Sequence, residues 1–184
     1  MHGYDAKDLA RSFRVVRKNT IQIAEDIPED KYDFRPAEGV RTVAETLRHL
    51  AVGSNWPMRA HGERLTELKF EMFGEVMAQA KQAEAKLHTK SDIVKALQEN
   101  GEVFAAFMEG LSDDVLAEHV SFPPQAQMPP KTRFEMLIST KEHEMHHRGQ
   151  LMLVERMLGI KPHLTRQMEE RMAAATRQPQ VAGA

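Results

Sequence analysis

Apolar residues recur every three or four positions along most of this chain, the spacing that places them on one face of an α-helix. The first such segment covers residues 5–26 and is followed directly by Ile27 and Pro28. Proline disfavours the helical conformation of the residue before it, so we expect the helix to end there. Its apolar face consists of Leu9, Phe13, Val16, Thr20, Ile23 and Ile27.

Two further segments show the same helical spacing. A second helix is predicted over residues 42–60, and Pro57 either bends it or ends it early. A third helix is predicted to begin at an N-cap formed by Ser91 and Asp92 and to end near Gly110. Both have a continuous apolar face, so both are expected to pack in the core.

The last predicted helix is the longest and covers residues 132–158. Gly159 and Pro162 follow it, and these two residues commonly end helices. A weaker, polar helical segment lies in the connection 61–90. Four prolines fall within residues 121–131, which are therefore predicted to be a loop.

These patterns predict an all-α fold, an antiparallel four-helix bundle with an extra polar helical segment. We found no period-two alternation, so no strand is expected. The length of 184 residues suits a single domain, which we place at residues 1–177 with a flexible tail at 178–184.

Composition narrows the classes of function. The chain has no cysteine, so a metal could be held only by His, Asp or Glu. The net charge of −2 gives no basic footprint for nucleic acid. Neither a signal peptide nor an apolar run long enough to cross a membrane is recognisable, so we expect a soluble, cytoplasmic protein with no membrane partner.

The nine histidines matter more for their positions than for their number. On a helical wheel, His143 and His147 fall one turn apart on the predicted inner face of the last helix. An unpaired buried polar group costs about 1–3 kcal/mol, and a shared metal ion would satisfy both rings. The alternative is a pair of hydrogen-bonded core histidines.

A catalytic zinc site needs three protein ligands and an open position. His49 is the candidate third ligand, because its neighbours on the second helix are mostly small and would suit the lining of a cavity. These neighbours are Thr42, Thr46, Gly53 and Trp56. The alternative is a half-exposed surface histidine. His146 is expected at the edge of the inner face, and the remaining histidines of the helical region lie at element ends or in loops, namely His61, His88, His119 and His163.

Residues 143–147, HEMHH, also match the zinc-peptidase motif His-Glu-x-x-His, in which Glu144 would be the general base. The extended motif requires glycine and histidine where this chain has Gln150 and Leu153. A later glutamate ligand is conceivable at Glu169 or Glu170. With no strand expected to hold a peptide substrate, a peptidase is the least favoured interpretation.

Three stretches together resemble the DinB-like (YfiT-like) proteins: HEMHHRGQL at 143–151, VRTVAETLRHL at 40–50 and FRP at 34–36. The likeness extends from about residue 5 to residue 159. It implies an up-down-down-up bundle, often paired as a homodimer, in which one divalent metal ion is held by His49, His143 and His147. It also implies that the match of Glu144 to the peptidase motif is accidental.

Some members of that family transfer low-molecular-weight thiols, and others are described as metal-dependent hydrolases. The resemblance therefore implies a metal-dependent enzyme, a thiol S-transferase or a hydrolase, acting on a small molecule. Zinc suits three imidazoles best, although nickel or another transition metal would also bind. The alternative is a non-enzymatic bundle that binds a metal or a small molecule. No catalytic role is assigned to Glu144, His146, Gln150 or Trp56.

The side of the last helix opposite His143 and His147 carries more apolar residues than a solvent-facing surface usually does. They are Leu137, Ile138, Met145 and Met152, set among Lys141, Arg148 and Glu155. We expect a homodimer formed through this surface. Gly149 would allow close approach of two backbones. The alternative is that the connection 61–90 covers the surface within one chain.

Overall fold

The first helix of the computed structural model, α1 (Ala6–Asp26), has the bounds that the sequence predicts. Asp5 caps it through a reciprocal pair of hydrogen bonds with Asp8. All six residues of the predicted apolar face are buried. The structure describes residues 3–177, so the tail predicted at 178–184 lies outside the described part of the chain.

The second predicted helix is divided into α2 (Val43–Val52) and α3 (Asn55–Gly62). The break falls at Gly53 and Ser54, before Pro57 rather than at it. Pro57 is the third residue of α3, where a missing N–H costs no helical hydrogen bond. It therefore starts a new helix instead of ending the old one.

The polar segment forms α4 (Phe70–Glu84), in which no residue is buried. After it comes α5 (Lys90–Glu109), whose N-cap is Thr89. The predicted cap at Ser91 and Asp92 is wrong by two to three positions. Asp92 instead accepts hydrogen bonds from the backbone at the start of the helix, completing the capping box that Thr89 begins.

The connection before the last helix is more ordered than the predicted loop. It contains α6 (Asp113–Ala117), a 3-10 turn, η2 (Pro124–Ala126), and two short strands, β1 (His119–Val120) and β2 (Lys131–Thr132). The strands pair antiparallel, with His119 opposite Thr132. The expectation of no strand is therefore wrong here, because two residues on each side are too few to show an alternating pattern.

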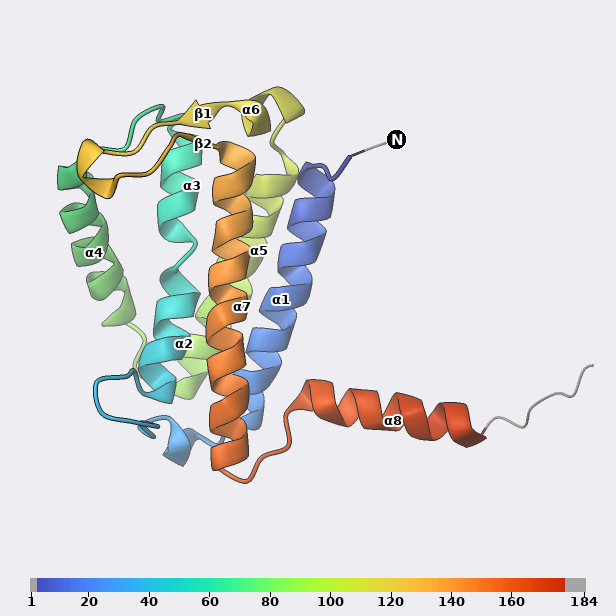
Figure 1. Cartoon of the computed structure of the whole chain (residues 1–184). Coiled ribbons are helices and arrows are strands. Elements are labelled where there is room, and N and C mark those ends of the chain that lie inside the picture. The colour runs from blue at the N-terminus through green and yellow to red at the C-terminus, as the bar shows by residue number, and fades with distance from the viewer. Residues whose placement is uncertain (1–2, 178–184) are drawn as a thin grey trace, which may run out of the picture.

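The long helix α7 (Arg133–Met157) follows β2 directly and ends before Gly159, whose φ of +78° suits glycine. Another 3-10 turn, η1 (Glu29–Lys31), follows α1. The final helix, α8 (His163–Arg177), was not predicted. It points away from the rest of the protein in Figure 1. No helix in residues 3–177 is long and apolar enough to cross a membrane.

Four helices form the bundle: α1 packs on α5 and α7, and α2 packs on the same two helices. α1 and α7 begin at the end of the bundle that carries β1 and β2, whereas α2 and α5 begin at the opposite end (Figure 1). α4 lies on the outer side of α2 (Figure 1). The predicted all-α fold is confirmed.

A buried ion pair lies between the two main apolar clusters of the bundle. Arg17 of α1 donates from Nε to Oε1 of Glu144 on α7 at 2.8 Å and from Nη2 to Oε2 at 2.9 Å. The same guanidinium also donates to the carbonyl oxygens of Leu50 in α2 and Leu97 in α5. One side chain thus bonds to the other three helices of the bundle.

The predicted orientation of α7 is wrong by part of a turn. Leu137 and Glu155, assigned to the outer side, are fully buried, and Glu144 is 2% exposed. His143, assigned to the centre of the inner face, is exposed. The surface proposed for a homodimer is therefore partly buried inside the chain, where α1 packs on α7.

We predict opposite effects for two glycine substitutions in bundle helices. A Cβ atom at Gly101 of α5 would lie 2.7 Å from Cγ of Arg17, whereas one at Gly149 of α7 would meet nothing within 4 Å. Gly101→Ala should lower the free energy of unfolding by about 1–3 kcal/mol through overpacking. Gly149→Ala should raise it by about 0.5–1 kcal/mol through helix propensity. Urea denaturation measures both, and a stabilised Gly101→Ala would contradict the packing described here.

A second prediction concerns Glu155. Its carboxylate finds no hydrogen-bond partner in residues 3–177, and burial together with Asp26 raises its pKa from 4.5 to about 7. Between these two pH values the folded state holds a proton that the unfolded state has lost, so Glu155 reduces stability as pH rises. Glu155→Gln should therefore gain stability relative to wild type from pH 4.5 to pH 7. If the free energies of unfolding of wild type and Glu155→Gln changed equally with pH over that range, Glu155 would have an ordinary pKa.

Candidate metal centre

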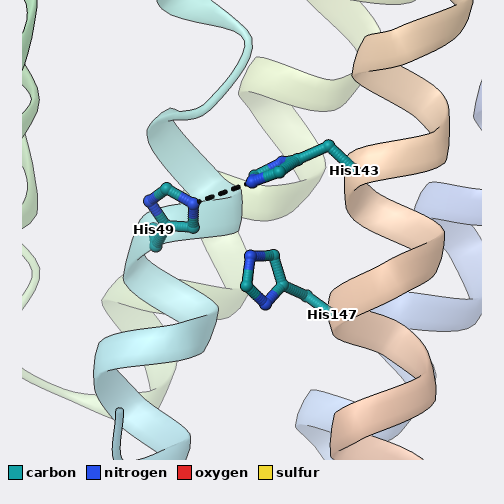
Figure 2. Close-up of side chains that lie close together, drawn as sticks. All are labelled: His49, His143 and His147. Atoms are coloured by element: carbon teal, nitrogen blue, oxygen red, sulfur yellow. Dashed lines mark hydrogen bonds between the residues drawn. The ribbon is translucent and has the colours of Figure 1, made fainter. Parts of the chain in front are cut away.

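Three histidines meet between α2 and α7. His49 stands in the last turn of α2, and His143 and His147 stand one turn apart on α7. Figure 2 shows the three rings facing one another across the space between the two helices. One ring nitrogen from each residue lies within 4.8 Å of the others, so the group could hold a metal ion.

The spacing of the nitrogens suits a small metal ion. Nε2 of His49 lies 3.1 Å from Nε2 of His143, as the dashed line in Figure 2 marks. Two imidazoles bound at 2.0–2.1 Å in a tetrahedral zinc site stand roughly 3.3 Å apart. The three ring centroids are 4.7–5.2 Å apart, and each pair meets nearly edge to face. The rings therefore need little movement to share one ion.

A hydrogen bond fixes the orientation of the His147 ring, and a carboxylate lies near the His49 ring. Nδ1 of His147 lies 2.8 Å from Oε1 of Gln150, so this nitrogen carries the proton and Nε2 keeps its lone pair. Gln150 in turn contacts His146 at 3.1 Å. Nδ1 of His49 lies 3.6 Å from a carboxylate oxygen of Glu84 on α4. Such outer contacts orient the ligands of metal sites.

All three imidazoles are held in the neutral form that a metal requires. Burial lowers the pKa of His49 to about 4, with smaller effects from Arg41 and the other two rings. Burial is also the main cause of the lowered pKa of His143 and of His147. The positive charge of Arg41 acts in the same direction on each ring.

The cluster lies between two cavities. A cleft of about 840 Å³ runs along the second half of α7 and is lined by His147, Gln150 and Arg41, with apolar walls that include Leu153 and Met157. A smaller cavity of about 180 Å³ on the other side is lined by His49, Gly53 and Trp56, together with residues of α4. The predicted position of His49 in a cavity lining is confirmed.

The other histidines divide into exposed and buried groups. His88 and His119 are exposed and His146 stands beside the cluster, which fits their predicted positions. His61 and His163 do lie at helix ends, but they are 1% and 3% exposed, which the sequence did not indicate. Glu84 and Arg41 were also missed, because neither lies on a helix that carries one of the three histidines.

The glutamate of the His-Glu-x-x-His pattern is engaged elsewhere. Glu144 is buried and bound by Arg17. It is therefore not free to serve as a general base at the histidines. Glu169, considered above as a distant ligand, forms an ion pair with Lys161.

The protein is therefore a helical bundle in which two adjacent helices bring three neutral imidazoles together. The profile of the DinB superfamily matches residues 12–151. The chain belongs to this superfamily. A search of curated proteins found no match.

Among solved structures, the chain is similar to a DinB-like protein of Bacillus subtilis, YjoA. The two share 23% sequence identity with a TM-score of 0.61. The match covers 82% of this chain and 91% of the other. At this level of sequence identity, the similarity shows only that the two proteins share a fold.

The structure predicts that Glu144 serves stability and not chemistry at the histidines. Glu144→Gln leaves the buried charge of Arg17 without its counter-ion, which should lower the free energy of unfolding by about 3–5 kcal/mol. The metal content of the folded variant should equal that of wild type. Denaturation measures the stability, and elemental analysis measures the metal content. Glu142→Gln, at an exposed position of the same helix, is the control for both. If folded Glu144→Gln lost its metal while Glu142→Gln kept it, Glu144 would have to be counted as part of the metal site.

Proposed function

We propose that this protein is a metal-dependent enzyme of the thiol S-transferase or hydrolase type, in which His49, His143 and His147 hold one divalent ion. The observation that carries the proposal is the convergence of three neutral imidazoles at the boundary of two cavities. Three protein ligands leave a coordination position open, as in catalytic sites.

Zinc is the proposed ion, since three imidazoles suit it, and nickel or another transition metal is the alternative. Bound there, the ion would act as a Lewis acid and lower the pKa of a coordinated water or thiol. Gln150 would hold His147 in the tautomer that presents Nε2, and Glu84 would orient His49.

The cleft beside His147 supports a small-molecule substrate. Its volume of about 840 Å³ lies within the range usual for ligand sites. Arg41 supplies a positive charge at its wall, which favours a substrate with an anionic group or a thiolate. The chain has no cysteine, so in a transfer reaction the sulfur would come from a low-molecular-weight thiol cosubstrate.

A non-enzymatic metal- or small-molecule-binding bundle is the alternative, and a fourth protein ligand on the ion would favour it. A zinc peptidase is disfavoured, because Arg17 holds the glutamate that such an enzyme needs.

The first test is metal content. The purified protein should carry about one divalent ion per chain, and His143→Ala/His147→Ala should lose it. His49→Ala should bind the ion far more weakly, because two ligands remain of three. His88→Ala, a change at an exposed histidine outside the cluster, is the matched control. Equal metal in wild type and the double variant, measured by elemental analysis, would refute the site.

Activity is tested on the metal-loaded protein. Thiol transfer to electrophilic small molecules, and hydrolysis of small esters and amides, should be screened with wild type and His49→Ala. We expect one of these reactions to require the ion, to stop with a chelator and to return when the ion is restored. Full metal occupancy without turnover in either screen, together with a fourth protein ligand, would favour the non-enzymatic alternative.

We further propose that the protein is a cytoplasmic homodimer. The exposed Met145 of α7, which lies outside the lining of the cleft, replaces the buried Leu137 as the candidate for the contact. Light scattering should give twice the chain mass of 20.9 kDa. A monomer mass at micromolar concentration would refute the dimer.

A further inference from the structure

A third cavity lies between α3, α7 and the connection that carries β2, apart from the cleft beside His147. Its volume is about 220 Å³, and its lining includes His61, Trp56, Phe122, Met136 and Lys131. Most of this lining is apolar or aromatic. Among its polar residues His61 is the most deeply buried, with only 1% of its surface exposed.

The hydrogen bonds of Arg133 determine the tautomer of His61. Arg133 is fully buried, and its Nη1 lies 3.3 Å from Nδ1 of His61. A guanidinium can only donate, so Nδ1 must be the acceptor and the proton of the neutral ring must sit on Nε2. Burial, with a smaller effect from Arg133, lowers the pKa of His61 to about 4, so the ring is neutral. His61 therefore carries an N–H donor at Nε2.

That donor finds no partner within residues 3–177. A buried donor left unpaired costs about 1–3 kcal/mol. The hydroxyl groups of Ser139 and Thr140, which also line the cavity, donate to the carbonyl oxygens of Glu135 and Met136 in their own helix. The polar group that the cavity can accommodate at His61 is thus a hydrogen-bond acceptor.

The charges around the cavity favour an anion. Lys131 lines it. The nearby carboxylates are already engaged: Glu118 pairs with Arg64 and Arg133, and Glu135 accepts from Thr132. Glu135 keeps its charge but is not part of the lining, so the lysine supplies positive potential within the lining itself.

We infer that this cavity binds a small carboxylate with an apolar or aromatic body, its oxygens bound by His61 Nε2–H and Lys131 and its body packed on Trp56, Phe122 and Met136. A volume of 220 Å³ exceeds the space of a single water many times over. The site is separate from the three-histidine cluster and does not require a metal ion.

Trp56 is the only tryptophan of the chain, and it lines both this cavity and the small cavity beside His49, so its fluorescence reports on both. The full-length protein is titrated with phenylacetate and, separately, with phenylacetamide, its uncharged analogue. Phenylacetate should change the emission saturably. Phenylacetamide should bind about tenfold more weakly, since it lacks a charge-assisted hydrogen bond.

Two variants locate the binding. Lys131→Met should raise the Kd for phenylacetate about tenfold, whereas Lys86→Met, the same change at an exposed position outside the cavity, should leave it unchanged. His61→Phe should abolish binding. Since that change also affects Arg133, the wild-type His61 ring is followed by nitrogen-detected NMR, where phenylacetate should shift Nε2 and leave Nδ1 bonded to Arg133.

The titration is repeated on the triple variant His49→Ala/His143→Ala/His147→Ala, in which binding should persist. Loss of binding in that variant would place the ligand at the three-histidine cluster and overturn the inference. Equal affinity for phenylacetamide would overturn the assignment of an anion. No saturable change of fluorescence at millimolar phenylacetate, with an unshifted His61 Nε2, would show that the cavity holds only water.

Discussion

The buried bond between Arg17 and Glu144 ties together the four helices of the bundle. Charges removed from water are costly unless they are paired and fully hydrogen-bonded, and Arg17 meets this requirement with oxygens from the three helices that surround it. One of these oxygens belongs to Leu50, the neighbour of His49, and the carboxylate belongs to the neighbour of His143. The pair therefore stabilises both helices that carry the histidines, without being part of the cluster itself. Gly101 is the complement, because only a residue without a side chain leaves room for the guanidinium stem.

The helices could be predicted from the sequence because their apolar faces repeat with the helical period. The three histidines could be singled out for a similar reason, since two are one turn apart and the third has small neighbours. The rotation of α7 could not be predicted. A wheel built on apolar residues takes Glu155 for a surface residue and gives no reason to bury Glu144, whereas the fold buries both. The same limitation hid Arg133 and His61, because pairing of buried polar groups depends on partners far away in the chain.

Polar residues inside this bundle occur in two sets that serve different needs. Arg17 and Arg133 have an acceptor at each guanidinium nitrogen and connect separate elements of the fold. The imidazoles of His49, His143, His147 and His61 are neutral and keep a nitrogen that the arginines do not use. The chain thus separates groups that hold the fold from groups that are available to a ligand. The four residues His-Glu-x-x at 143–146 contain both kinds side by side, which explains how a peptidase pattern can arise without a peptidase site.

α4 is held to the bundle without any buried residue, and this affects the rate at which an ion could exchange at the cluster. This helix covers the small cavity and supplies Glu84, yet none of its residues is buried. Segments with few buried contacts open at a free energy far below that of global unfolding. Detachment of α4 would uncover His49 while the bundle and its ion pair stay intact. Ion exchange at the cluster should therefore follow the rapid opening of this one helix, and its half-time should be independent of the rate at which the whole protein unfolds.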